Sequence, residues 1–159
     1  MPKNTDIKGI KEKFKPTQKG KEQIKDAIII IKVIVHLKIN DSMIKKVIDQ
    51  MLWNISGAHG KYLTRYRSED VISEKSVNLN HEHVFPRKQV IEEIMNNIGQ
   101  IEDILKNKTV GCVVSTEEHQ RLKEVEKENP QLKGWQRYKE ARIKVRDMKN
   151  DSEFDLNTI

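Results

Sequence analysis

Histidine and glutamate side chains at two places in the chain have the chemistry that an active site needs. The first is the run His81-Glu82-His83, where a carboxylate stands between two imidazoles and Pro86 follows closely. The second is His119, which falls one turn inside a predicted helix. A carboxylate and an imidazole can share a divalent cation, and a further neutral histidine can accept a proton from water. A metal ion beside a general base can hydrolyse a phosphodiester bond, so we expect a metal-dependent hydrolytic site.

The elements around these residues are predicted to bring them together. We expect a short strand over residues 81–85, stopped by Pro86, and a second strand over residues 110–114. Ser115 and Glu118 form a capping box that begins a helix reaching about residue 127. The start of this helix can pack beside the end of the first strand. Further helices are expected between the two strands, over residues 87–98 and 101–105.

The same residues resemble the signature of a nuclease family. Residues 82–86, Glu-His-Val-Phe-Pro, resemble the acid–His–apolar–x–Pro signature of the HNH nucleases, also called ββα-metal nucleases. Residues 110–119 resemble that family's second strand and the helix that carries its last histidine, so the ββα-metal core would cover about residues 80–127. The resemblance implies that His83 is the general base and that Glu82 and His119 hold one divalent metal ion. Mg²⁺ is the expected ion, with Mn²⁺, Ni²⁺ and Zn²⁺ as alternatives.

Strand geometry leaves an alternative set of ligands open. Side chains alternate along a regular strand, so His81 and His83 would share one face and Glu82 would lie on the other. A bulge would bring Glu82 and His83 together, and without one His81 rather than Glu82 is the candidate ligand. The family's middle asparagine corresponds to Val110 in this chain, and Asn107 stands just before the strand. A backbone carbonyl could orient the base instead.

The chain as a whole predicts a mostly helical α+β fold with one globular domain over residues 23–148. Residues 1–22 are rich in lysine and are expected to form a flexible basic arm. Residues 149–159 are expected to form a polar tail. One domain with its own core is the natural outcome for a chain of 159 residues.

Four further elements are predicted from the spacing of apolar residues. A largely buried helix over residues 23–37 and an amphipathic helix over residues 41–55 predict an antiparallel helical hairpin. Alternation of aromatic and polar residues predicts a strand over residues 62–66. A last amphipathic helix is expected over residues 135–146.

The charge of the chain favours an anionic partner. Lysine and arginine outnumber aspartate and glutamate by 30 to 24, which gives a net charge of +6. We therefore expect nucleic acid as the partner, with DNA favoured over RNA. Cutting both strands with one site per chain would favour a homodimer. The candidate phosphate contacts are Arg65, Arg67, Arg87 and Lys88.

Composition restricts the other function classes. The single cysteine, Cys112, excludes a disulfide within the chain and a cysteine-based zinc site. The longest apolar run, residues 27–37, is interrupted by Lys32 and His36 and is too short for a bilayer, so no membrane partner and a cytoplasmic location are expected. Two alternatives remain: a non-catalytic basic nucleic-acid-binding module on a degenerate HNH fold, and a helical protein-interaction domain. The first predicts salt-dependent binding without cleavage, and the second predicts no DNA binding at physiological salt.

Overall fold

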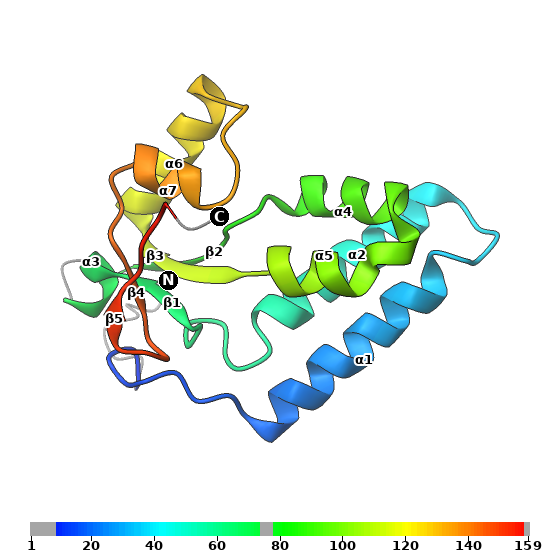
Figure 1. Ribbon diagram of the computed structural model, residues 1–159, viewed down its shortest axis with the longest axis horizontal. Helices are drawn as coiled ribbons and strands as arrows, with labels where there is room; N and C mark the ends of the chain where they lie inside the picture. Colours follow the sequence, from blue (N-terminus) through cyan, green and yellow to red (C-terminus); the bar gives the residue numbers. More distant parts are fainter. Residues whose placement is uncertain (1–8, 74–77, 158–159) are drawn as a thin grey trace.

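The structure is a computed structural model, and it describes residues 9–73 and 78–157. A helical half and a sheet half lie beside each other (Figure 1). The helical half packs around an aliphatic core in which Ile31, Ile48 and Ile94 are fully buried. Its helices are α1 (Gln18–Ile34), α2 (Asp41–Ser56), α4 (Arg87–Asn96) and α5 (Ile101–Lys108), with the 3-10 turn η1 (Ile98–Gln100) before α5.

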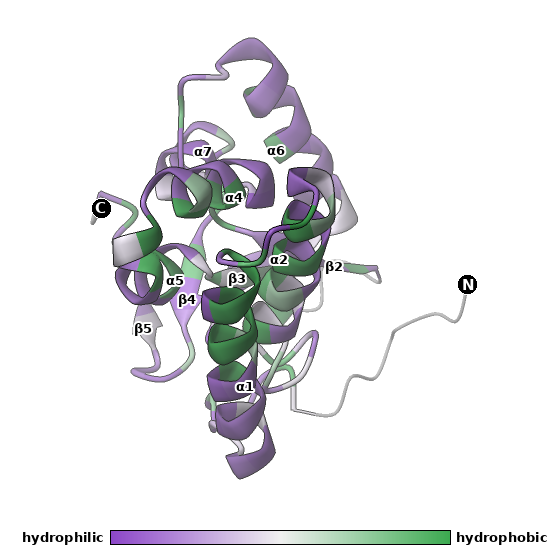
Figure 2. Cartoon of the chain, turned by 90° about the vertical axis from the view of Figure 1, so that its right-hand side faces the viewer, coloured by the Kyte–Doolittle hydropathy of each residue, from purple (hydrophilic) through white to green (hydrophobic). Residues whose placement is uncertain are grey.

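Helices α1 and α2 form the antiparallel hairpin that the apolar spacing predicts. Each begins at a side chain that accepts a hydrogen bond from a first-turn amide: Thr17 from Gly20, and Asn40 from Ser42. Figure 2 shows apolar residues along much of α1, and three of them, Ile29, Ile30 and Val33, are exposed rather than buried in the core. Among the described residues, no helix combines the length and the apolar character needed to cross a lipid bilayer.

The sheet half contains five strands in the order β2-β3-β1-β4-β5. Strand β1 runs parallel to β3, and the other neighbouring pairs are antiparallel. Helix α6 packs on β2 and β3, and α7 packs on α6 (Figure 1). The elements are β1 (Tyr66–Ser68), α3 (Glu69–Ile72), β2 (Leu79–His83), β3 (Gly111–Ser115), α6 (Thr116–Glu128), α7 (Trp135–Glu140), β4 (Val145–Asp147) and β5 (Ser152–Glu153).

The predicted α+β class and the strand–strand–helix core are confirmed. Strands β2 and β3 form an antiparallel pair, the helices α4 and α5 lie in the connection between them, and α6 follows β3 directly. The predicted capping box is also present, because the Ser115 hydroxyl accepts from the Glu118 amide while the Glu118 carboxylate accepts from the Ser115 amide. Strand β2 lies two residues earlier than the predicted strand over residues 81–85.

The helix predicted over residues 135–146 is wrong beyond residue 140. Helix α7 ends at Glu140, and Arg142 takes a φ of 54°, which no α-helix accommodates. The chain then returns as β4, which pairs with β1. Val145 in this strand and Ile143 just before it are both buried. These two residues alternate with Lys144 and Arg146, a period-2 pattern that was the available sign of a strand. The strand predicted over residues 62–66 likewise lies later, in β1.

The described part of the predicted flexible arm is packed against the sheet half. Helix α1 already begins at Gln18, and the Phe14 amide donates to the Met148 carbonyl. Residues 1–8 of the arm lie outside the described residues. The buried Arg67 guanidinium holds the segment by donating to the backbone carbonyls of Gly9, Ile10 and Glu12.

The described part of the predicted polar tail is packed as well. Strand β5 pairs with β4, and the Phe154 ring centroid lies 4.9 Å from that of Tyr66 and 4.7 Å from that of Trp135. Phe154 and Leu156 both pack against the apolar core of the sheet half, and these two residues dock the segment on the sheet.

Candidate functional site

The pairing of β2 with β3 decides which candidate residues meet. The register runs without interruption, with His81 opposite Val113, Glu82 opposite Cys112 and His83 opposite Gly111. No bulge separates Glu82 from His83, so the two side chains point to opposite faces of the strand. Glu82 therefore faces α6, whereas His81 and His83 face the end of α2.

Glu82 and His119 come together on the α6 face. The Glu82 Oε2 atom lies 2.5 Å from His119 Nδ1, although the residues are 37 positions apart. The capping box fixes the start of α6 at the end of β3, and this places His119 one turn into the helix beside β2. The side chains are 15% and 28% exposed, respectively, so a small ligand can reach the pair from solvent.

Arg137 is the third charged residue at this site, and the sequence did not indicate it. Its guanidinium is buried, and Nη2 lies 3.8 Å from Glu82 Oε1 and 3.6 Å from Glu126 Oε2. Its Nη1 donates to the carbonyls of Val84, at 3.1 Å, and His83, at 3.4 Å. A fixed positive charge therefore stands behind Glu82, held by the backbone that follows β2.

Arg137 reaches this position because of a glycine before α7. Gly134 has φ 56° and ψ −133°, and its α-hydrogen faces the Phe85 ring closely enough that a Cβ atom would lie 2.6 Å from that ring. Only glycine accepts both the conformation and the close approach. In an amphipathic pattern a buried arginine cannot be distinguished from a surface arginine, so the sequence carried no sign of the position of Arg137.

His81 and His83 lie on the other face of β2, around Ser56 at the end of α2. The Ser56 Oγ atom is 2.9 Å from His83 Nε2 and 3.1 Å from His81 Nε2. The indole ring of Trp53 covers both imidazoles, with ring centroids 5.4 Å from His81 and 4.5 Å from His83. The His81 Nδ1 atom is 2.6 Å from the Lys61 carbonyl, which closes the cluster.

Burial keeps both histidines uncharged near neutral pH. Desolvation, with the nearby His81 and Arg87 charges, lowers the pKa of His83 to about 3. Desolvation also lowers the pKa of His81, and the hydrogen bond to Lys61 partly opposes this. A base with such a low pKa accepts a proton weakly, so this cluster is better suited to accepting hydrogen bonds or ligating a cation.

Two predicted phosphate contacts are engaged by acidic residues, and one is exposed. Arg65 forms a two-point ion pair with Asp147, at 2.6 and 2.8 Å. Arg87 pairs with Asp49 at 2.6 Å and stacks over the Trp53 ring. Lys88, in the first turn of α4, is exposed and can meet phosphate.

Arg67 cannot make the predicted phosphate contact in this structure. The side chain is 1% exposed, and its guanidinium is used on backbone carbonyls of the N-terminal segment and of Thr64. Desolvation lowers the pKa of Arg67, an effect that the nearby Glu12 opposes. Arg67 is therefore a residue that holds the segment before α1 on the sheet.

The pair Glu82–His119 fits a hard divalent cation that keeps most of its water. One carboxylate oxygen and one imidazole nitrogen converge, both partly exposed. Mg²⁺ and Mn²⁺ are commonly bound by one or two protein groups, with water and substrate phosphate completing the shell. Within the described ranges, no three His, Cys, Asp or Glu side chains gather as a metal cage. The pair therefore supplies two protein ligands at most to an ion held there.

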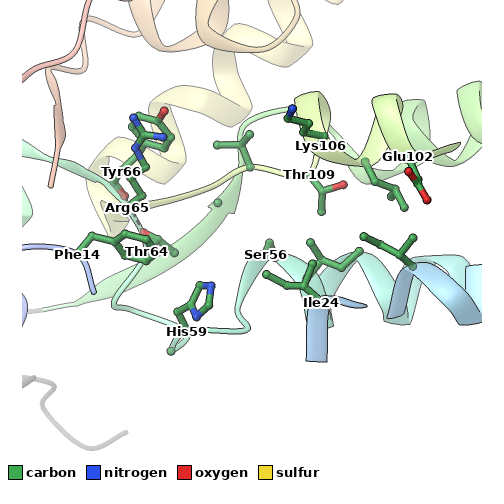
Figure 3. Close-up of a pocket in the computed structure, with 16 residues that line it drawn as sticks. Phe14, Ile24, Ser56, His59, Thr64, Arg65, Tyr66, Glu102, Lys106 and Thr109 are labelled. Carbon is green, nitrogen blue, oxygen red and sulfur yellow. Dashed lines mark hydrogen bonds between the residues drawn. The ribbon is translucent and has the colours of Figure 1, made fainter. Parts of the chain in front are cut away.

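A pocket of about 460 Å³ lies between the helical half and the sheet (Figure 3). Its wall is largely aliphatic, with residues of α1, α2 and α5 facing β1 and the start of β3. Ser56 and Gly111 line it, and so the pocket borders the His81–Ser56–His83 cluster. The Thr109 hydroxyl is a buried wall atom without a hydrogen-bond partner among the described residues.

Comparisons of the chain with models of known protein families, with curated proteins and with solved structures find no match. The geometry of β2, β3 and α6, together with the motif that these elements carry, is therefore the basis for assigning a function.

Proposed function

We propose that the protein is a metal-dependent nuclease that hydrolyses the phosphodiester backbone of nucleic acid, with DNA the favoured substrate. The observation that carries the proposal is the contact between Glu82 and His119. A strand and a capped helix deliver a carboxylate and an imidazole to one partly exposed point, from positions far apart in sequence. This is the ligand pair that the HNH resemblance implies.

Glu82 and His119 would hold the ion, Mg²⁺ first and Mn²⁺, Ni²⁺ or Zn²⁺ as alternatives. When bound, the ion would supply positive charge where negative charge develops on the phosphate. In its absence the two side chains hydrogen-bond to each other, so a cation would replace the shared proton. Arg137, behind Glu82, is fixed by two backbone carbonyls and keeps the carboxylate oriented toward His119.

The proposal gives His83 no proton transfer in the described conformation. Its ring lies across the strand from the Glu82–His119 pair, and its Nε2 atom is occupied by the Ser56 hydroxyl. The general-base role that the resemblance implies for His83 stays a prediction, and it requires the end of β2 to twist or bulge. His81, the alternative metal ligand, is likewise separated from His119.

The chemistry of the surface supports nucleic acid as the partner. The net charge of +6 attracts a polyanion, and the exposed Lys88 follows β2 closely in sequence. We also propose a cytoplasmic location, because a chain with a single cysteine, Cys112, cannot form an internal disulfide. A non-catalytic nucleic-acid-binding module is the alternative that the same charge supports.

An aliphatic stripe supports the proposal that two copies act together. Within the described residues, the exposed large apolar side chains concentrate around the turn of the helical hairpin. The simplest way to bury such a patch is contact with the same patch on a second copy of the chain, related by a two-fold axis. A dimer would bring two sites to one duplex. The stripe consists of Ile29, Ile30, Val33, Leu37, Ile39 and Met43, each between 42% and 56% exposed.

The test is conversion of supercoiled plasmid to nicked or linear DNA by purified protein. We expect cleavage with Mg²⁺ or Mn²⁺ and none after chelation. The alternative module predicts salt-dependent DNA binding with no cleavage in either condition. Cleavage that is unaffected by chelation would contradict the proposed metal chemistry.

A further inference from the structure

Three hydrogen-bond acceptors surround the single hydroxyl proton of Ser56. The His83 Nε2 atom is 2.9 Å from Ser56 Oγ, His81 Nε2 is at 3.1 Å, and the Trp53 carbonyl is at 3.4 Å. Both imidazoles are more than nine-tenths buried, with 8% and 7% exposure for His81 and His83. The single hydroxyl proton can satisfy only one of these three acceptors, so the cluster lacks hydrogen-bond donors.

The other nitrogen of each ring shows why both Nε2 atoms are acceptors. His81 Nδ1 lies 2.6 Å from the Lys61 carbonyl, a contact that requires a proton on Nδ1. The Leu52 backbone acts to raise the pKa of His83, so an acceptor lies beside the imidazole there. Because Nε2 of His83 faces Ser56, Nδ1 is the nitrogen on the Leu52 side. With the proton of each ring on Nδ1, the two unprotonated Nε2 atoms face the same point.

We propose that His81 Nε2 and His83 Nε2, with the Ser56 hydroxyl as a third oxygen, bind a divalent transition-metal ion on the face of β2 opposite Glu82 and His119. Metal-ligating histidines almost always donate the other ring N–H to a carbonyl or carboxylate, and His81 is placed to do so to the Lys61 carbonyl. Two imidazoles without a carboxylate suit Ni²⁺, Zn²⁺ and Cu²⁺, whereas Mg²⁺ prefers oxygen ligands such as the carboxylate that Glu82 supplies on the other face. This site is independent of the proposed nuclease chemistry.

Space and access for the ion come from the neighbouring pocket. Ser56 and Gly111 both line that pocket, which is large enough for the ion to arrive with bound water (Figure 3). A Cβ atom at Gly111 would lie 2.8 Å from His81 Nε2, so glycine keeps the ligand edge open. Arg87, whose charge acts on His83, is paired with Asp49, which reduces its repulsion of a cation.

Trp53 provides the readout, because its ring lies against both histidines. We would strip the purified protein with a chelator, titrate it with Ni²⁺ alone and follow tryptophan fluorescence. The expected result is saturable quenching at one Ni²⁺ per chain. Trp53→Phe should lose this quenching, because the other tryptophan, Trp135, packs in the sheet half.

Variants of the two proposed histidine ligands, with control variants of Glu82 and His119 on the opposite face of β2, complete the test. His81→Gln and His83→Gln should each weaken the Ni²⁺ affinity reported by Trp53 quenching by about tenfold or more. Glu82→Gln and His119→Gln lie on the opposite face of β2 from Trp53, so they should leave this Trp53 quenching unchanged even if they alter Ni²⁺ binding at their own face. Quenching that needs Glu82 and His119 but not the two β2 histidines would overturn the proposal. So would a wild-type titration without saturable quenching.

A second measurement needs no variant and covers the case in which the ligand variants fail to fold. Electron paramagnetic resonance of the wild-type protein with one equivalent of Cu²⁺ should show coupling to two imidazole nitrogens. Coupling to one nitrogen, or a spectrum of free Cu²⁺, would contradict a site built from His81 and His83.

Discussion

Gly134→Ala should destabilise the fold and disturb the position of Arg137. The new methyl group would lie 2.6 and 2.7 Å from two carbons of the Phe85 ring, and the backbone at residue 134 lies in a region that is rare for L-residues. The ring cannot swing aside freely, since Phe85 packs against both apolar cores. The backbone strain costs about 1–3 kcal/mol, and the overpacking adds a similar amount.

The expected loss is therefore about 2–6 kcal/mol in the free energy of unfolding. For a domain of this size, that corresponds to a fall of roughly 4–24 °C in Tm. Urea unfolding followed by circular dichroism measures it directly. Because Gly134 positions α7, DNA cleavage at a temperature where the variant is folded should also fall.

Gly99→Ala is the matched control. A Cβ atom at Gly99 meets nothing within 4 Å, and its backbone φ is not positive. We expect its free energy of unfolding to stay within about 0.5 kcal/mol of wild type. If Gly134→Ala unfolds at the same urea concentration as Gly99→Ala, the reasoning about the Phe85 contact and the position of α7 is refuted.

Three further predictions concern the ion pairs and the surface. The Arg65 hydrogen bond lowers the pKa of Asp147, so this pair adds stability above the unfolded carboxyl pKa of about 4 and loses it as the pH falls through the folded pKa. Asp147→Asn should thus be less stable than wild type in urea at pH 7, with the gap closing in acid. Arg67→Met should lower the free energy of unfolding by about 3–5 kcal/mol in the same assay, because it leaves buried backbone carbonyls without a hydrogen-bond donor. A smaller loss of stability than that of Asp147→Asn would contradict the role of Arg67 in holding the N-terminal segment. Val33→Glu should convert a dimer to a monomer in light scattering, and a mass equal to that of wild type would contradict the proposed interface.

Local sequence signals were sufficient for the helical hairpin and for the position of His119. Asn40 and Ser115 are caps whose hydrogen bonds stay within one helical turn, so their effect can be read without knowing the rest of the fold. The alternation of side chains along a regular strand also predicted that Glu82 and His83 would lie on opposite faces. Only the uninterrupted β2–β3 register, a long-range property, could decide between that outcome and a bulge.

Long-range packing determined the features that the sequence did not predict. Arg137 resembles a surface residue until α7 is folded back onto β2, and Arg67 resembles a phosphate ligand until the N-terminal segment covers it. Residues 143–147 satisfy both helical and strand spacing, and pairing with β1 selected the strand. In each case the deciding partner is distant in the chain.

The most direct test of the central claim compares plasmid cleavage by Glu82→Gln and Glu126→Gln. Both carboxylates lie near Arg137, at 3.8 and 3.6 Å, but only Glu82 contacts His119. The account predicts that Glu82→Gln loses at least about a hundredfold in the Mg²⁺-dependent nicking rate, while Glu126→Gln keeps the wild-type rate. Wild-type nicking by a folded Glu82→Gln protein would contradict the assignment of the Glu82–His119 pair as the catalytic metal site.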